Sequence, residues 1–153
     1  MNGGRWLAVC LLLVAAASPA VEPAGLLRDF PSGTVVLADP ALRCLRIRAW
    51  FADSRRHQAR GLMYIERLEP FEGMLFRYRR PALITMWMKN TYVPLDMLFF
   101  DAAGELERVA ADTTPLSEAR IVSGGPVTMV LELPAGFAAT WGLGQGSRLL
   151  LAE

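Results

Sequence analysis

Lysine, histidine and cysteine are scarce in this chain, and the shortage of histidine and cysteine excludes two classes of function. The 153 residues include one lysine, Lys89, among 16 basic residues, one histidine, His57, and two cysteines. With His57 in an arginine-rich stretch and no Gly-x-Ser-x-Gly motif, nucleophilic catalysis of the hydrolase type has no support. The cysteines and the histidine lack the spacing of a zinc site, and no glycine-rich phosphate-binding loop occurs. We therefore expect no metal site, no cofactor and no assignable catalytic residue.

The N-terminal stretch has the layout of a secretory signal peptide. Arg5 precedes an apolar run from Trp6 to Ala17, and Ser18-Pro19-Ala20 ends in a small-x-small pattern. The run is shorter than the roughly 20 residues of a membrane-spanning helix, which favours cleavage near Ala20 over an uncleaved anchor. We predict an exported, periplasmic protein. Its expected parts are a signal peptide (1–20), a flexible lead-in (21–32) and a single β-rich domain (33–153).

The mature chain has no net charge and one cysteine. Removing Arg5 with the signal leaves 15 basic residues (16 − 1) against 15 acidic ones. A neutral domain has no electrostatic surface for nucleic acid, and we expect membrane contact only if the N-terminal segment stays uncleaved. The expected partner is an unidentified small molecule or a component of the cell envelope. Cys44 alone cannot form an internal disulfide and is expected to pack as a small buried hydrophobe.

Short β-strands dominate the predicted secondary structure. The segment 45–51 alternates apolar and basic residues, and 96–101 is an almost unbroken apolar run whose two faces should both be covered. Ser54 and Gly61 bracket a short helix at 55–60. Further strands are expected at 34–38, 73–78, 83–88, 105–110, 127–133 and 147–152, with a turn at 79–81, a long loop at 113–126 and a second helix near 135–141. About eight short strands with one or two short helices predict a mainly β fold, a compact barrel or sandwich.

Five motifs occur in order along the mature chain. They are Arg60-Gly61-Leu62-Met63, Gly73-Met74-Leu75-Phe76, Trp87-Met88-Lys89-Asn90-Thr91, Pro94-Leu95-Asp96 and Val130-Leu131-Glu132-Leu133-Pro134-Ala135-Gly136. Together they resemble a bacterial and archaeal family, the domain of unknown function 192. The resemblance implies a single, mostly β, barrel-like domain that frequently follows a signal or anchor, and it brings no established activity. The loop between Thr114 and Val127 departs from the usual pattern of that family.

The only lysine lies in the segment with the most unusual composition, between Met86 and Asp96. In a chain that otherwise uses arginine, Lys89 indicates a need for a compact, flexible ammonium group. One interpretation is a buried Lys89–Asp96 ion pair, with Asn90 holding the turn. The other is a polar pocket that orients a small ligand beside a tryptophan face. The predicted ligand-binding residues are Trp87, Met88, Lys89, Asn90, Thr91 and Asp96.

A second charged pair is predicted between the first helix and the sheet. Arg60 ends that helix immediately before Gly61, and Glu132 interrupts an apolar strand. A structural Arg60–Glu132 ion pair would tie the helix to the sheet, whereas the alternative is two unrelated solvated charges.

Two other functions compete with ligand binding. Met86 and Met88 share a strand face, and thioethers bind soft ions such as Cu(I) or Ag(I), although methionine also fills gaps in β cores. An enzyme acting on cell-envelope material, with Lys89 as a base assisted by Asp96, is the third possibility. We expect an exported small-ligand binding or accessory module, with the soft-metal binder and the enzyme as alternatives.

Overall fold

The computed structural model describes residues 23–41 and 43–152 of the chain, so the predicted signal peptide lies outside the described residues. Within the described part no helix has the length and apolarity to cross a membrane. The elements are α1 (Pro23–Leu26), β1 (Ser32–Ala38), β2 (Cys44–Ala52), α2 (Arg55–Arg60), β3 (Glu72–Met86), β4 (Leu95–Phe100), β5 (Leu106–Ala110), β6 (Ile121–Pro134), α3 (Phe137–Trp141) and β7 (Arg148–Ala152).

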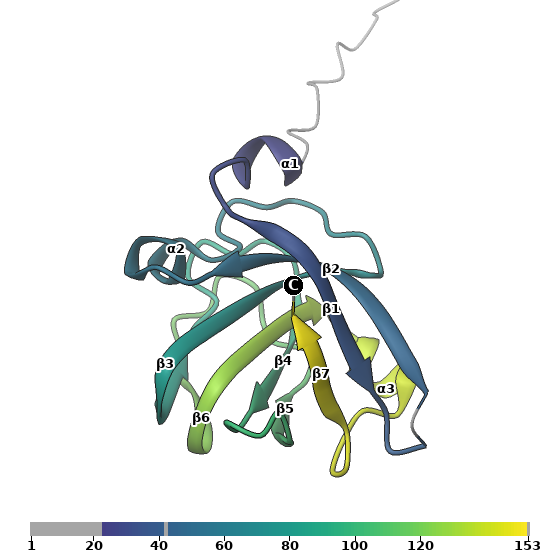
Figure 1. The fold of residues 1–153 in the computed structure, drawn as a ribbon. Helices are drawn as coiled ribbons and strands as arrows, with labels where there is room; N and C mark the ends of the chain where they lie inside the picture. Colours follow the sequence, from purple (N-terminus) through teal and green to yellow (C-terminus); the bar gives the residue numbers. More distant parts are fainter. Residues whose placement is uncertain (1–22, 42, 153) are drawn as a thin grey trace, which may run out of the picture.

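The described strands form one curled, seven-stranded sheet in the order β5-β4-β6-β3-β2-β1-β7 (Figure 1). All neighbouring strands are antiparallel except β2 and β3, which run parallel because α2 and the segment after it form the crossover. The curl brings the two edges together at one end, where Glu105, just before β5, forms an isolated bridge with Arg148 at the start of β7. The result is a half-barrel, and the predicted mainly β, barrel-like fold is confirmed.

The two faces of the sheet carry separate apolar cores. Neighbouring residues of a strand point to opposite faces, so the pairs Leu75–Leu131 and Leu131–Leu98 belong to one layer. Met74 and Met97 flank Glu132 on the other face, whose core is covered by α1, the segment after α2 and the residues after β3. All six residues of β4 are buried, which confirms the expectation that both of its faces are covered.

The longest strands depart from the predicted boundaries. Arg79, Arg80 and Pro81 were expected to form a turn, but β3 runs through them and pairs with β6 on both sides of an irregularity between Arg77 and Ala82. Proline is tolerated there because the bulged residues are unpaired. The predicted loop likewise contains the first six of the 14 residues of β6, from Ile121 to Pro126. Pairing between β3 and β6 therefore determines the secondary structure of both segments, and it overrides their local turn propensity.

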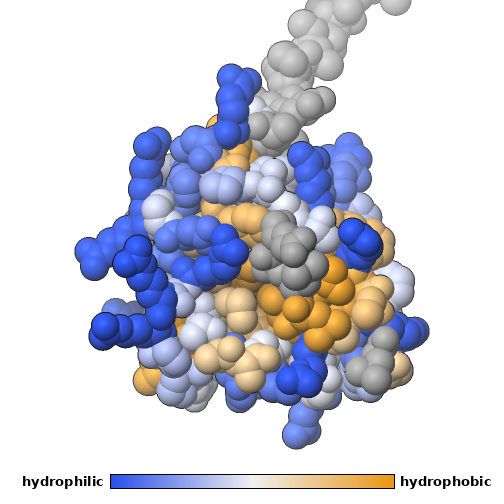
Figure 2. All heavy atoms as spheres, in the orientation of Figure 1, coloured by the Kyte–Doolittle hydropathy of each residue, from blue (hydrophilic) through white to orange (hydrophobic). Residues whose placement is uncertain are grey.

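Two further expectations differ from the structure. Part of the predicted flexible lead-in forms α1, and Leu27 and Phe30 are buried in the core beneath it. Cys44 was expected to be buried but is exposed at the start of β2. Figure 2 shows that hydrophobic side chains gather over β1 and β7, whereas hydrophilic ones cover the margin near α2.

Candidate functional site

The candidate site is centred on Glu132, an acid inside an apolar layer. Glu132 pairs in register with Met74 of β3 and Met97 of β4, and its side chain is 4% exposed. The strands approach closely here because Gly73 has no side chain: a Cβ at that position would lie 2.3 Å from the backbone oxygen of Glu132. Within the described residues, no hydrogen bond or ion pair engages the Glu132 carboxyl group. Glu132 is therefore a buried residue whose carboxyl group has no protein partner and keeps a small contact with solvent, since no described side-chain oxygen is both fully buried and unpartnered.

Burial changes the ionisation of this site. Loss of solvent raises the pKa of Glu132 from an ordinary 4.5 to about 8, so the carboxyl group is mainly protonated at neutral pH. Burial and the neighbouring charge of Glu132 raise the pKa of Tyr78 to about 12, so the phenol keeps its proton. An acid with a pKa near the working pH, facing a cavity, is a common feature of functional sites.

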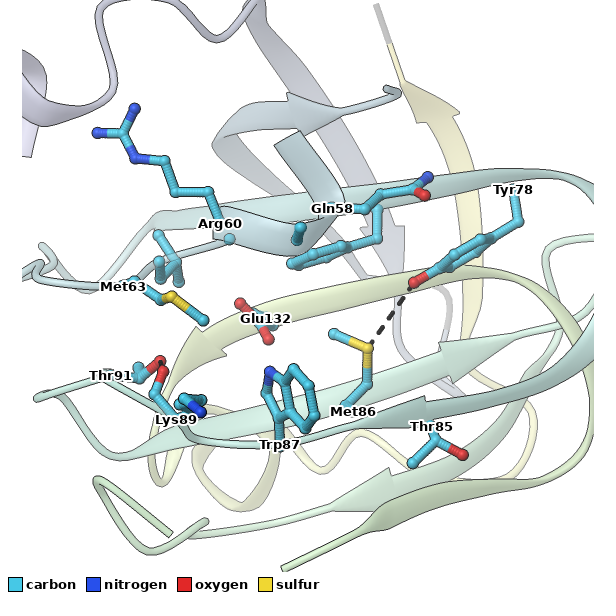
Figure 3. Close-up of a pocket in the computed structure, with 14 residues that line it drawn as sticks. Gln58, Arg60, Met63, Tyr78, Thr85, Met86, Trp87, Lys89, Thr91 and Glu132 are labelled. Carbon is cyan, nitrogen blue, oxygen red and sulfur yellow. Dashed lines mark hydrogen bonds between the residues drawn. The ribbon is translucent and has the colours of Figure 1, made fainter. Parts of the chain in front are cut away.

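A cavity of about 250 Å³ opens above Glu132 (Figure 3). It is bounded by α2, the turn that follows α2, strand β3, the residues after β3, and β6. In Figure 3 the Glu132 carboxyl group lies between Met63 on one side and Met86 on the other, with Trp87 beneath it. The lining residues are Gln58, Ala59, Arg60, Gly61, Leu62, Met63, Phe76, Tyr78, Thr85, Met86, Trp87, Lys89, Thr91 and Glu132.

Hydrogen bonds fix the walls of the cavity. The Gln58 amide donates to the carbonyl groups of Ala52 (3.2 Å) and Arg77 (2.9 Å), which holds α2 against β2 and β3. Next to the lining residues Met63 and Lys89, the backbone N–H of Tyr64 donates to the Asn90 carbonyl at 2.8 Å, and the Asn90 amide donates to the Tyr64 hydroxyl at 3.0 Å. These bonds tie the turn after α2 to the turn after β3, so the cavity is preformed.

Comparison with known proteins gives a family and no activity. The family model DUF192, described as "Uncharacterized ACR", matches residues 37–151. The chain belongs to the DUF192 family. The resemblance seen in its sequence motifs is thereby confirmed. No curated protein matches this DUF192 chain.

Two solved structures share the DUF192 fold. A crystal structure from Sinorhizobium meliloti 1021, described as a candidate transcription regulator, is 37% identical, with a TM-score of 0.77 over 79% of this chain and 94% of that one. A protein of unknown function from Novosphingobium aromaticivorans DSM 12444 is 32% identical, with a TM-score of 0.78 over 89% of this chain and 94% of the other. Both likenesses support the fold of this DUF192 protein.

Three of the predicted ligand-binding residues, Trp87, Lys89 and Thr91, line the cavity of this DUF192 domain. The Lys89 ammonium lies 3.6 Å from the Glu118 carboxylate and 6.0 Å from the centre of the Trp87 ring. Both partners of this ion pair are substantially exposed, at 44% and 65% of their side chains, so the pair contributes little to stability. Asn90 adopts a left-handed backbone conformation (φ 55°) and shapes the cavity through the bonds to Tyr64.

Asp96 has a different role from the one considered in the sequence. The proposed Lys89–Asp96 ion pair is absent from the described contacts, because Asp96 is fully buried and has other partners. Its carboxylate accepts hydrogen bonds from the backbone N–H groups of Asp112 (2.9 Å) and Ala138 (2.8 Å). Asp96 therefore joins β4 to the 112 turn and to the start of α3, on the face of β4 opposite Met97.

Arg60 also has other partners than the one predicted. Its guanidinium donates to Asp29 at 3.0 Å and to the carbonyl group of Leu26, and it lies 5.5 Å from the centre of the Phe30 ring. Figure 3 shows the side chain turned away from Glu132, although both residues line the cavity. The predicted Arg60–Glu132 ion pair is not among the described contacts. The N-terminal segment, expected to be a lead-in, supplies the acceptors that Arg60 binds instead.

The methionines are divided between cavity and core. Met86 lines the cavity and accepts a hydrogen bond from the Tyr78 hydroxyl at 3.8 Å, and Met63 accepts one from the Asn90 amide at 3.9 Å. Met88, by contrast, is buried in the core, where its sulfur atom accepts a hydrogen bond from the Thr113 hydroxyl group at 3.1 Å. The thioethers that share the cavity are thus Met63 and Met86, and the soft-metal site predicted at Met86 and Met88 stays a prediction.

Sequence reasoning missed Glu132 as the centre of the site and Tyr78, Gln58 and Met63 as parts of its walls. The signal for Glu132 was present, because a lone acid in an apolar strand is costly to bury. The other three lie on elements whose approach depends on long-range pairing, and no local pattern marks them.

Proposed function

We propose that this protein is a small-ligand binding module whose binding site is the cavity above Glu132. The observation that carries the proposal is Glu132, a residue 4% exposed, whose carboxyl group faces a 250 Å³ cavity and has no hydrogen-bond partner in the described protein. Burying such a group lowers the stability of the fold unless something else is gained. Retention of a destabilising residue is typical of a functional site.

The walls suit a ligand that is partly apolar and has one polar group. Trp87 and Phe76 offer aromatic faces and Met63 and Met86 offer thioethers, while Glu132 provides the polar contact. Such a mixture of apolar walls with few polar groups is usual for small-molecule sites. Lys89 lies at the rim of this cavity. The proposed binding site therefore overlaps the site expected from the sequence, but its centre is Glu132.

The enzyme alternative would use the same cavity. A carboxyl group with a pKa near 8 is suited to hold or deliver a proton at neutral pH, as a general acid or base must. Such a role requires a bound substrate, so binding is the first property to test. The export of the module is part of the proposal and rests on the N-terminal sequence from Arg5 to Ala20.

A fragment screen with methionine methyl groups as reporters tests the proposal. Protein labelled at the methionine methyl carbon gives separate NMR signals, and we expect bound fragments to shift those of Met63 and Met86. Met129, which packs in the opposite core, is the internal control. If no fragment at millimolar concentration shifts the two cavity signals, or if Met129 shifts equally, the cavity is not a binding site.

A parallel titration with Ag(I) tests the soft-metal alternative. Binding of Ag(I) through thioethers would shift the methyl signals of the ligating methionines at stoichiometric concentration. Absence of a shift at Met86 and Met88 would remove that alternative.

A further inference from the structure

The ionisable groups around the cavity are not equally available to a ligand. Arg60 is held outward by Asp29 and the carbonyl group of Leu26. Lys89 pairs with Glu118 at the rim. Within the described residues Glu132 alone combines a formal charge, burial and an unpartnered carboxyl group that faces the cavity. Ionisation of this carboxyl group therefore places a negative charge at the floor of the cavity, and a ligand that stabilises the ionised form is favoured there.

The walls have the properties that stabilise a cation. The rings of Phe76, Tyr78 and Trp87 line the cavity, and the negative face of an aromatic ring attracts a positive charge. Met63 and Met86 add polarizable sulfur atoms. A neutral apolar ligand in the same place would leave the carboxyl group unsatisfied, and an anion would oppose its ionisation, whereas a cation favours the ionised form.

We infer that the cavity binds a compact organic ammonium group, primary or quaternary, with the Glu132 carboxylate as its counter-ion and Phe76, Tyr78 and Trp87 as its aromatic walls. This inference rests on the proposed function and specifies the chemical class of its ligand. The volume of the cavity, about 250 Å³, limits the bound part to a group of about ten heavy atoms, since a cavity of about 150 Å³ holds benzene.

Binding of such a cation displaces a proton from Glu132. The free carboxyl group is protonated at neutral pH, and the bound cation stabilises the carboxylate, so one proton passes to solvent and no covalent bond changes. Affinity should then rise about tenfold per pH unit below pH 8 and become constant above it, where the free pocket is already ionised.

Few other groups can distort this pH dependence. Tyr78 of β3 faces Glu132 but keeps its proton throughout the range, because its pKa is about 12. Arg60 of α2 and Lys89 after β3 are the basic residues that line the cavity, and each is engaged by an acid outside it, Asp29 and Glu118 respectively. Beside Met97 on β4, Asp96 points to the opposite face of the sheet.

Isothermal titration calorimetry with isosteric probes tests the inference. The probes are choline, methylammonium, the uncharged carbon isostere of choline, neohexanol, and the anion of tert-butylacetic acid. We expect choline or methylammonium to bind at least about tenfold more tightly than neohexanol at pH 8, because only a cation gains the carboxylate and the ring faces. At pH 7, titrations in buffers of different ionisation enthalpy should show release of close to one proton.

Two variants provide matched controls. Glu132→Gln keeps the shape of the side chain and should remove both the cation preference and the proton release. Lys89→Met removes a positive charge at the rim and should strengthen cation binding, provided the folds match by circular dichroism. If Glu132→Gln does not fold, the proton release and pH dependence of the unaltered protein decide the question.

The outcomes separate this inference from the proposed function. Equal binding of neohexanol and choline, or a preference for the anion, overturns the ammonium inference and leaves the cavity as a binding site for another class. If no probe shifts the Met63 and Met86 methyl signals and no fragment does so either, both proposals fail.

Discussion

At the scale of single residues, two buried acids of one sheet have opposite roles. Asp96 and Glu132 both interrupt apolar strand sequence, and both are more than nine-tenths buried. The Asp96 carboxylate is satisfied by two backbone N–H groups, whereas Glu132 faces a cavity. The sequence could identify both as buried acids but could not distinguish them, because the partners of Asp96 come from the 112 turn and α3, which are distant in sequence.

The ionisation of Glu132 predicts how stability depends on pH. Its folded pKa of about 8 lies above the ordinary 4.5, so between about pH 5 and pH 8 the unfolded chain has lost the proton that the folded chain keeps. The free energy of unfolding should therefore fall with rising pH in this window, by up to about 1.4 kcal/mol per unit from this group. Urea unfolding from pH 5 to pH 9 measures the slope. Glu132→Gln should lack it and be more stable above pH 8; parallel curves for the two proteins would contradict the prediction.

Lys89 and Asp96 should differ in their contributions to stability. Lys89→Met breaks an exposed ion pair and should change the free energy of unfolding by less than about 1 kcal/mol. Asp96→Asn places an amide N–H₂ group against a backbone donor and should cost about 1–3 kcal/mol. Chemical denaturation at pH 7 compares them. A larger loss from the lysine variant would restore the interpretation of Lys89 as a structural brace.

At the scale of elements, short segments with a strong local pattern were predicted well. The helix 55–60 agrees with α2 because Ser54 accepts from the His57 N–H group and Gly61 adopts a positive φ, as the capping pattern required. The turn expected at 79–81 and the last part of the loop expected at 113–126 were wrong, because pairing of β3 with β6 extends both strands past proline and glycine. Capping residues and apolar periodicity can be read from the local sequence. The length of β3 and β6, however, depends on pairing with a strand about 40 residues away.

The contact between β3 and β6 gives a prediction for this pair of strands. At Gly73 a Cβ atom would lie 2.3 Å from the Glu132 backbone oxygen and 2.8 Å from a Leu133 methyl carbon, so Gly73→Ala must separate the strands. We expect a loss of at least about 1–3 kcal/mol, or failure to fold. Gly125→Ala, with no atom within 4 Å of the added Cβ, is the matched control and should be close to neutral. Similar denaturation midpoints for the two variants would show that the strands can relax.

At the scale of the whole molecule, the N-terminal segment belongs to both the core and the site. Leu27 and Phe30 are buried against the layer that contains Glu132, and Asp29 holds Arg60 away from the cavity. The proline, glycine and alanine residues in this segment led to the prediction of a loose lead-in. Composition alone does not show that two apolar side chains of the segment pack against the sheet. A domain boundary near residue 33 would leave that surface exposed.

Truncation tests this boundary. A chain that begins at residue 32 should be less stable than one that begins at residue 21 by about 3–5 kcal/mol, the usual cost of removing large side chains from a core. Asp29→Asn in the longer chain is the control: it weakens the exposed contact with Arg60 and should cost less than about 1 kcal/mol. Urea unfolding measures both. Because Leu27 and Phe30 pack directly on the core, equal stability of the two chain lengths is possible only if the segment detaches in solution, and the domain would then begin near residue 33.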